Sequence, residues 1–173
     1  MFETDILKIT EIVHKKGGLV YCDGANLNAV MGKTKINTMG VDVLHFNLHK
    51  TFSTPHGGGG PGAGPVGIVD KLGPFLPVPV IEHTDGKYRL NYDCPDSIGK
   101  IKSFFGNFGI LVRAYTYIRS LGPEGIKQVA EMAVLNANYI KSSLKEYFNL
   151  PYNGHSLHEC VFNDKHQLKN NVS

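Results

Sequence analysis

Apolar residues recur at helical spacing near the start of the chain and then give way to two short apolar runs. Three isoleucines and Val13 share one face of a helix predicted over 5–16, which Gly17 and Gly18 end. The run 19–22 is typical of a strand in a buried parallel sheet, and the run 41–48, which mixes apolar and polar positions, predicts a second strand. A helix followed by two such strands indicates an α/β fold, in which ligands bind at the carboxyl ends of the strands.

Beyond residue 50, the pattern predicts further strands first and helices from about residue 107 onward. A third strand is predicted over 66–69, and the polar, turn-rich stretch 82–91 is typical of a hairpin. Helical spacing of apolar residues predicts helices over 107–121 and 123–148, separated by a Gly-Pro pair. One short strand is predicted over 159–162, and the polar residues after it carry no packing signal.

Composition and charge exclude several classes of protein. The 173 residues include 18 Lys and Arg against 15 Asp and Glu, a net charge of +3, and 42% are hydrophobic. A charge so small and dispersed argues against binding to nucleic acid or to a membrane surface. No apolar run approaches the roughly 18–20 residues that a membrane span requires. The composition is that of a folded protein.

The cysteines indicate the redox environment. Cys22, Cys94 and Cys160 form no CxxC pair and no spacing typical of metal ligands. Their odd number, with an acidic N-terminus that lacks the features of a signal peptide, predicts reduced thiols and a cytoplasmic location. No metal site is predicted.

Two polar residues at the ends of the first two strands carry the candidate chemistry. Asp23 ends the first run, and Lys50 follows the second by two positions. A partly buried amine at such an edge is a candidate nucleophile toward an aldehyde. Pyridoxal phosphate chemistry needs such an amine and a carboxylate beside the pyridine nitrogen. Taken singly, a surface lysine and an ordinary turn carboxylate remain the alternative interpretations.

Nearby residues fit the same site. Ala25 is small enough to lie flat against a ring, although a small turn residue explains it equally well. His49 precedes the lysine and is a candidate contact of cofactor or substrate; the alternative is a packed side chain. His56 lies in the following loop, within reach of the site. His45, inside the second strand, is interpreted as a structural histidine.

A glycine-rich run begins with Gly57, Gly58, Gly59 and Gly60. Its backbone has too much conformational freedom for regular structure. Three interpretations stay open: a cradle of backbone N–H groups for phosphate, a flap that admits a bulky substrate arm, and a mobile linker. We favour the flap, because the run begins seven residues after Lys50 (57 − 50) and no Lys-Ser or Lys-Thr closes a phosphate loop.

Several long strings resemble one enzyme family. They are YCDGANLNA from Tyr21, LHFNLHKTFSTPHGGGGPG from Leu44 and SFFGNFG from Ser103. These strings resemble the glycine cleavage system P-protein over about 5–159, and their spelling is closest to subunit 2 of the two-subunit bacterial form.

The resemblance implies a pyridoxal-phosphate fold of type I, similar to aspartate aminotransferase. It implies that 1–118 form the C-terminal part of the cofactor-binding large domain, and that 119–173 form a linking helix and an incomplete small domain. It marks the following site residues: Lys50 as the residue that carries the covalent aldimine, Asp23 as the partner of the pyridinium nitrogen, Ala25 as the ring-packing residue and His49 as a catalytic neighbour of the cofactor.

The resemblance also implies a reaction and its partners. The family is a glycine dehydrogenase (aminomethyl-transferring), an oxidoreductase that releases carbon dioxide from glycine. The remaining aminomethyl group passes to the lipoyl arm of the H-protein. A second P-protein subunit, in a heterotetramer, is implied as a further partner.

The chain is interpreted as partial, because the groups expected to hold the cofactor phosphate and to stack on its ring are not recognisable. One alternative is a catalytically inactive or assembly-only fragment. Another is a different type I decarboxylase or desulfurase, but the HGGGGPG string argues against this alternative.

Overall fold

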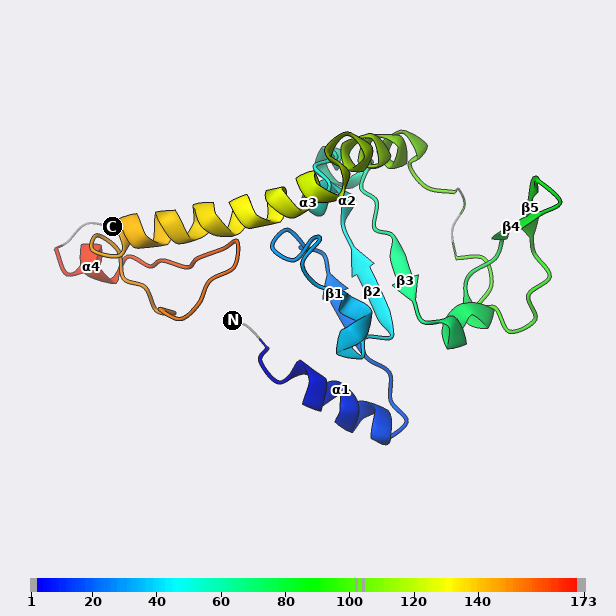
Figure 1. The fold of residues 1–173 in the computed structure, drawn as a ribbon, viewed down its shortest axis with the longest axis horizontal. Coiled ribbons are helices and arrows are strands. Elements are labelled where there is room, and N and C mark those ends of the chain that lie inside the picture. Colours follow the sequence, from blue (N-terminus) through cyan, green and yellow to red (C-terminus); the bar gives the residue numbers. More distant parts are fainter. Residues whose placement is uncertain (1–2, 102, 104, 171–173) are drawn as a thin grey trace.

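The computed structural model describes residues 3–101, 103 and 105–170. Three short strands form its central sheet, in the order β1 (Tyr21–Gly24), β2 (Val43–Phe46) and β3 (Val66–Ile68) (Figure 1). Strands β1 and β2 are parallel, with Asp23 opposite His45, whereas β3 runs antiparallel to β2. The parallel pair brings the carboxyl ends of β1 and β2 to the same edge of the sheet.

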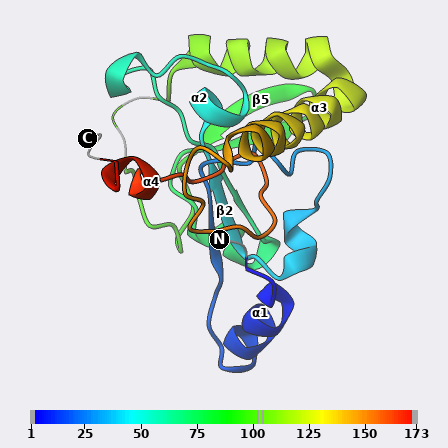
Figure 2. The same cartoon turned by 90° about the vertical axis from the view of Figure 1, so that its left-hand side faces the viewer.

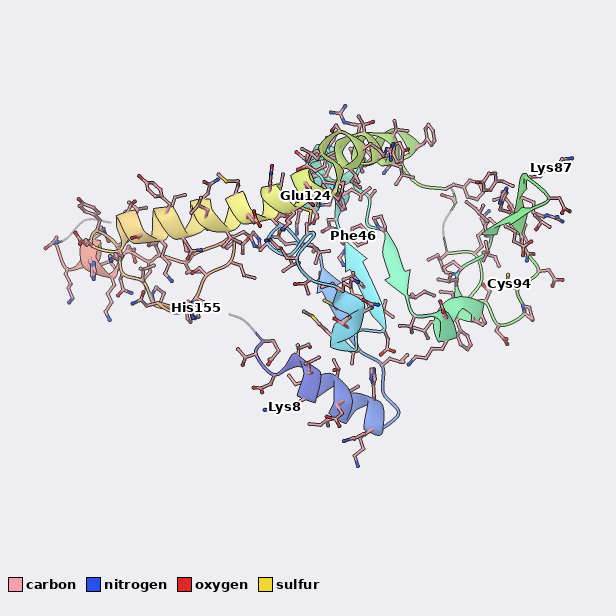
Figure 3. All side chains as sticks on the ribbon, viewed as in Figure 1. Lys8, Phe46, Lys87, Cys94, Glu124 and His155 are labelled. Atoms are coloured by element: carbon pink, nitrogen blue, oxygen red, sulfur yellow. The ribbon has the colours of Figure 1, made fainter. Side chains whose placement is uncertain are left out.

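The remaining elements are four α-helices, three 3-10 helices and a separate two-stranded hairpin, among the described residues. The α-helices are α1 (Ile6–Lys15), α2 (Leu48–Thr51), α3 (Phe108–Leu144) and α4 (Lys165–Leu168). The 3-10 helices are η1 (Ile36–Met39), η2 (Gly57–Gly59) and η3 (Asp70–Phe75). Strands β4 (Val80–Thr84) and β5 (Lys87–Asn91) form the predicted hairpin, which projects away from the central sheet with Lys87 at its tip (Figure 3).

Helix α1 confirms the helix predicted over 5–16. The chain leaves it at Gly17, whose φ of 76° glycine adopts without a steric penalty. The Gly17 N–H donates to His14 O at 2.9 Å, which satisfies one of the last helical carbonyls. The helix contacts η1 and the residue after it, where Thr10 is buried against Gly40.

Strand β2 ends at Phe46, and not at position 48 as the sequence predicted, because the chain turns there into α2. The glycine-rich loop returns alongside this turn, and the Leu48 N–H donates to Ala63 O at 3.1 Å. The Leu48 carbonyl in turn accepts the Thr54 N–H at 3.2 Å. Lys50 therefore lies on a short helix just beyond the strand.

Helix α3 consists of two segments that run in different directions (Figures 1 and 2). They meet at Gly122, whose φ of 64° and ψ of −177° lie outside the helical region, and Pro123 opens the second segment as predicted. In the first segment, Ile110 and Ala114 pack against Leu48 of α2 and form the buried core beside the sheet.

The strand predicted over 159–162 is wrong, since these residues form no regular structure. Instead Asn163 pairs with Asn149 in an isolated antiparallel bridge. A strand requires consecutive paired residues, and a single bridge does not supply them. The Gln167 amide donates to Tyr147 O at 2.8 Å, so the polar C-terminal stretch lies against the end of α3.

Candidate active site

Asp23 presents its carboxylate at the carboxyl edge of the sheet, and its side chain is 66% exposed. Its Oδ1 accepts the Ala25 N–H at 2.9 Å and lies 3.3 Å from His45 Nδ1 on the neighbouring strand. Among the described residues, Oδ2 has no polar partner. The turn therefore joins Ala25 to Asp23 and leaves one carboxylate oxygen available to a ligand.

Lys50 lies on α2 with an exposed side chain. Within the part of the chain that the structure describes, its amine makes no hydrogen bond or ion pair. The next residue, Thr51, is buried, and its Oγ1 accepts the Leu27 N–H at 3.2 Å. This bond ties α2 to the loop that follows Asp23. Sequence reasoning missed Thr51, because its partner Leu27 lies 24 positions away and no local pattern predicts the contact.

His49 and His56 lie together beside Lys50. Their ring centroids are 5.0 Å apart and their planes cross at 70°. His49 Nδ1 is buried and has no hydrogen-bond partner among the described residues. Burial lowers the pKa of His49, and the charges of His56 and Lys50 lower it further. Both effects favour the neutral imidazole, and Nδ1 is left without a hydrogen-bond partner among the described residues.

The predicted flap is a turn of 3-10 helix, although the sequence predicted no regular structure there. Gly58 has a φ of 76°, and its N–H donates to His56 Nδ1 at 3.1 Å. Asn107, which precedes α3, donates from Nδ2 to Gly62 O at 2.8 Å and to Gly60 O at 3.3 Å. The Asn107 side chain, which sequence reasoning did not single out, therefore connects this glycine-rich loop to the start of α3.

Neither a metal-binding cluster nor a membrane-spanning helix occurs in the described part of the chain. No group of three or more His, Cys, Asp or Glu side chains there is arranged to hold a metal ion. None of the described helices is both long and apolar enough to cross a membrane.

The sequence has close relatives, although no protein-family model matches it. Over 169 residues and 98% of the chain, it is 57% identical to the probable glycine dehydrogenase (decarboxylating) subunit 2 of Bacillus licheniformis. The chain is related to part of glycine dehydrogenase (decarboxylating) subunit 2. The protein of the same name from Chlorobium phaeobacteroides is 56% identical over 177 positions and 99% of the chain. These relatives confirm the family resemblance, and the chain spans 35% and 36% of their respective lengths.

Two solved structures share the fold. A crystal structure of glycine decarboxylase (P-protein) of the glycine cleavage system, in inhibitor-bound form, matches 82% of this chain and 34% of its own. Its TM-score is 0.67 at 21% identity. Glutamate decarboxylase of Lactobacillus brevis matches 89% of this chain and 35% of its own, with a TM-score of 0.56 at 18% identity. These two matches confirm the predicted fold, which is of type I.

Proposed function

We propose that this chain supplies the cofactor-binding lysine of a pyridoxal-phosphate-dependent glycine dehydrogenase (decarboxylating). One observation supports this most directly, in a chain 57% identical to a relative of that name. Asp23 lies near the carboxyl end of β1, and Lys50 follows the carboxyl end of the adjacent parallel strand β2. The cofactor requires an amine and a ring-nitrogen carboxylate. Both residues fit, because Asp23 Oδ2 and Lys50 Nζ have no partner among the described residues.

Each site residue has a role in this proposal. Lys50 would hold the cofactor through its amine, and Asp23 would hold the ring nitrogen and keep it protonated. Ala25 would lie against the ring, and the unpartnered Nδ1 of His49 would form a hydrogen bond to cofactor or substrate. When bound, pyridoxal phosphate supplies an electron-accepting ring that stabilises the charge left on the glycine α-carbon as carbon dioxide leaves.

The glycine-rich segment admits the second substrate in this proposal. His56 and Gly57 to Gly60 act as a flap that opens for the lipoyl arm of the H-protein, which receives the aminomethyl group. The division into a large domain over 1–118 and a small domain over 119–173 remains a prediction. So does the cytoplasmic location.

A larger assembly completes the site. The relatives are named as subunits, which supports a partner P-protein subunit, and we propose the heterotetramer that the sequence resemblance implies. The chain spans only about a third of these relatives. We therefore propose that the groups for the cofactor phosphate and the ring face lie in the part of subunit 2 that the chain does not match.

Absorption spectroscopy tests the central step. Pyridoxal phosphate added to the purified chain should give the visible band of a lysine-bound cofactor, and Lys50→Ala should abolish it. Lys87→Ala is the matched control, since Lys87 is exposed at the hairpin tip (Figure 3). A band that survives Lys50→Ala would contradict the assignment.

The alternative of an inactive or assembly-only fragment is distinguished by adding partners. The chain, a partner subunit and lipoylated H-protein should together exchange labelled carbon dioxide into the glycine carboxyl group. A lysine-bound cofactor without this exchange would favour the inactive fragment. Release of carbon dioxide from glutamate, or of sulfide from cysteine, would favour another type I decarboxylase or a desulfurase.

A further inference from the structure

His45 joins the candidate site through contacts that the strand register creates. It lies opposite Asp23 in the parallel pair, and its Nδ1 is 3.3 Å from Asp23 Oδ1. Its Nε2 is 3.0 Å from the amide nitrogen of Asn47, and its Nδ1 is 3.1 Å from the Tyr21 hydroxyl. The Tyr21 ring stacks on the imidazole with an interplanar angle of 7°. Both ring nitrogens of His45 are therefore engaged.

These partners select one tautomer of the neutral ring. The Asn47 amide nitrogen can only donate, so His45 Nε2 must accept and carry no proton. The proton then resides on Nδ1, facing the Asp23 carboxylate and the Tyr21 oxygen. The opposite tautomer would place the Nδ1 lone pair against a carboxylate oxygen, which is electrostatically unfavourable.

The two carboxylate oxygens of Asp23 have different surroundings. Oδ1 is held by the Ala25 N–H at 2.9 Å and faces the Nδ1 proton of His45, whereas Oδ2 has no partner among the described residues. An exposed aspartate otherwise rotates freely between rotamers and loses that freedom when it binds a ligand. A carboxylate fixed at one oxygen presents the other in a constant direction.

We propose that His45 is a positioning residue, whose Nδ1–H holds Asp23 Oδ1 so that Oδ2 accepts the ring N–H of the cofactor. This inference rests on the proposed function and deepens it. It also changes the role of His45 from a structural histidine of the strand to the side chain that supports Asp23.

The tautomer can be measured on the chain without cofactor. In ¹⁵N NMR of the neutral ring, His45 should show a protonated Nδ1 and an unprotonated Nε2, and the signals should be missing from His45→Asn. A protonated Nε2 with an unprotonated Nδ1 would overturn the inference. The measurement needs no variant to be active.

Cofactor binding provides the second test. His45→Phe keeps the stack on Tyr21 but removes both nitrogens, and it should weaken pyridoxal phosphate binding about tenfold, as expected for loss of a hydrogen bond to a charged group. His45→Asn keeps a donor at the position of Nδ1 and should restore binding to within about threefold of the parent. Tyr21→Phe, which keeps the ring, should bind like the parent.

A readout on the cofactor separates positioning from general damage to the fold. With ¹⁵N-labelled pyridoxal phosphate, the ring nitrogen should shift toward its unprotonated value in His45→Phe and not in Tyr21→Phe. Equal affinity and an unchanged nitrogen shift in His45→Phe would overturn the inference. If the parent chain shows no lysine-bound cofactor at all, the proposed function fails, and the tautomer alone decides whether His45 supports Asp23.

Discussion

Asp42 is a buried carboxylate at the amino end of β2, away from the candidate site. Its side chain is 4% exposed. It accepts hydrogen bonds from Lys71 Nζ at 2.7 Å and from the Val20 N–H at 2.8 Å, and it lies 2.7 Å from His14 Nε2. The bond to Lys71, then those to Val20 and His14, hold the pKa of Asp42 well below its usual range. This cluster connects α1, β1, β2 and η3.

We predict that this carboxylate makes the stability of the chain depend on acid pH. Because its pKa is lower in the folded than in the unfolded state, its contribution is complete above about pH 4 and is lost progressively at lower pH. In urea unfolding, Asp42→Asn should have a lower midpoint than the parent at pH 7, and the two midpoints should converge as the pH falls.

The control for this prediction is Asp96→Asn, which removes an exposed aspartate. Its midpoint should follow that of the parent across the whole pH range. Parallel curves for Asp42→Asn and the parent would show that Asp42 contributes nothing to the acid dependence.

Among the secondary-structure elements, α3 contains two glycines that should respond to alanine in opposite directions. Gly122 has a φ of 64°, which L residues rarely adopt, whereas Gly109 is helical and has no atom within 4 Å of an added Cβ. Gly122→Ala should destabilise the fold by about 1–3 kcal/mol. Gly109→Ala should stabilise it by about 0.5 kcal/mol. Urea unfolding measures both, and two changes of the same sign would contradict the broken helix.

The connection between the flap and α3 gives a prediction about local opening. Asn107→Ala removes the two bonds to the carbonyls of Gly60 and Gly62. Amide hydrogen exchange over 57–62 should then become faster, while exchange in α1 stays unchanged as an internal control. Unchanged exchange over 57–62 would mean that other contacts hold the flap.

The elements predicted correctly are those with a strong local signal. Helix α1 has an apolar face and a glycine stop, and the Gly-Pro pair marks the break in α3. The short helix α2 was missed, because the apolar run continues through Leu48 and only the returning loop, bonded at Ala63, ends the strand. The contacts of Thr51 and Asn107 were missed for the same reason: each joins segments distant in sequence.

At the scale of the whole molecule, the chain exposes an unusually large surface. Its accessible area is 12368 Å². A compact monomer of this mass, 19.0 kDa, exposes only about 8,400 Å². Much of the excess is apolar, including Tyr115, Leu135 and Tyr139 on α3, which are 64%, 59% and 72% exposed. Residue patterns predicted the helices, but they cannot indicate how much of the core lies within one chain.

We predict that the isolated chain binds apolar dyes and self-associates through these faces. Its mass by light scattering should rise with concentration above that of the monomer. Leu135→Glu with Tyr139→Glu should reduce both dye fluorescence and mass, while the helical circular dichroism is kept. A monodisperse chain that binds no dye would contradict the exposed arrangement of α3.

The central claim is that Lys50 is the residue that bonds to pyridoxal phosphate. Borohydride reduction of the chain mixed with the cofactor converts the C=N bond into a stable amine, and peptide mass spectrometry then locates it. We predict a modified peptide at Lys50 at cofactor concentrations too low to label the exposed Lys87. Equal labelling of Lys50 and Lys87, or no labelling of Lys50, would contradict the claim.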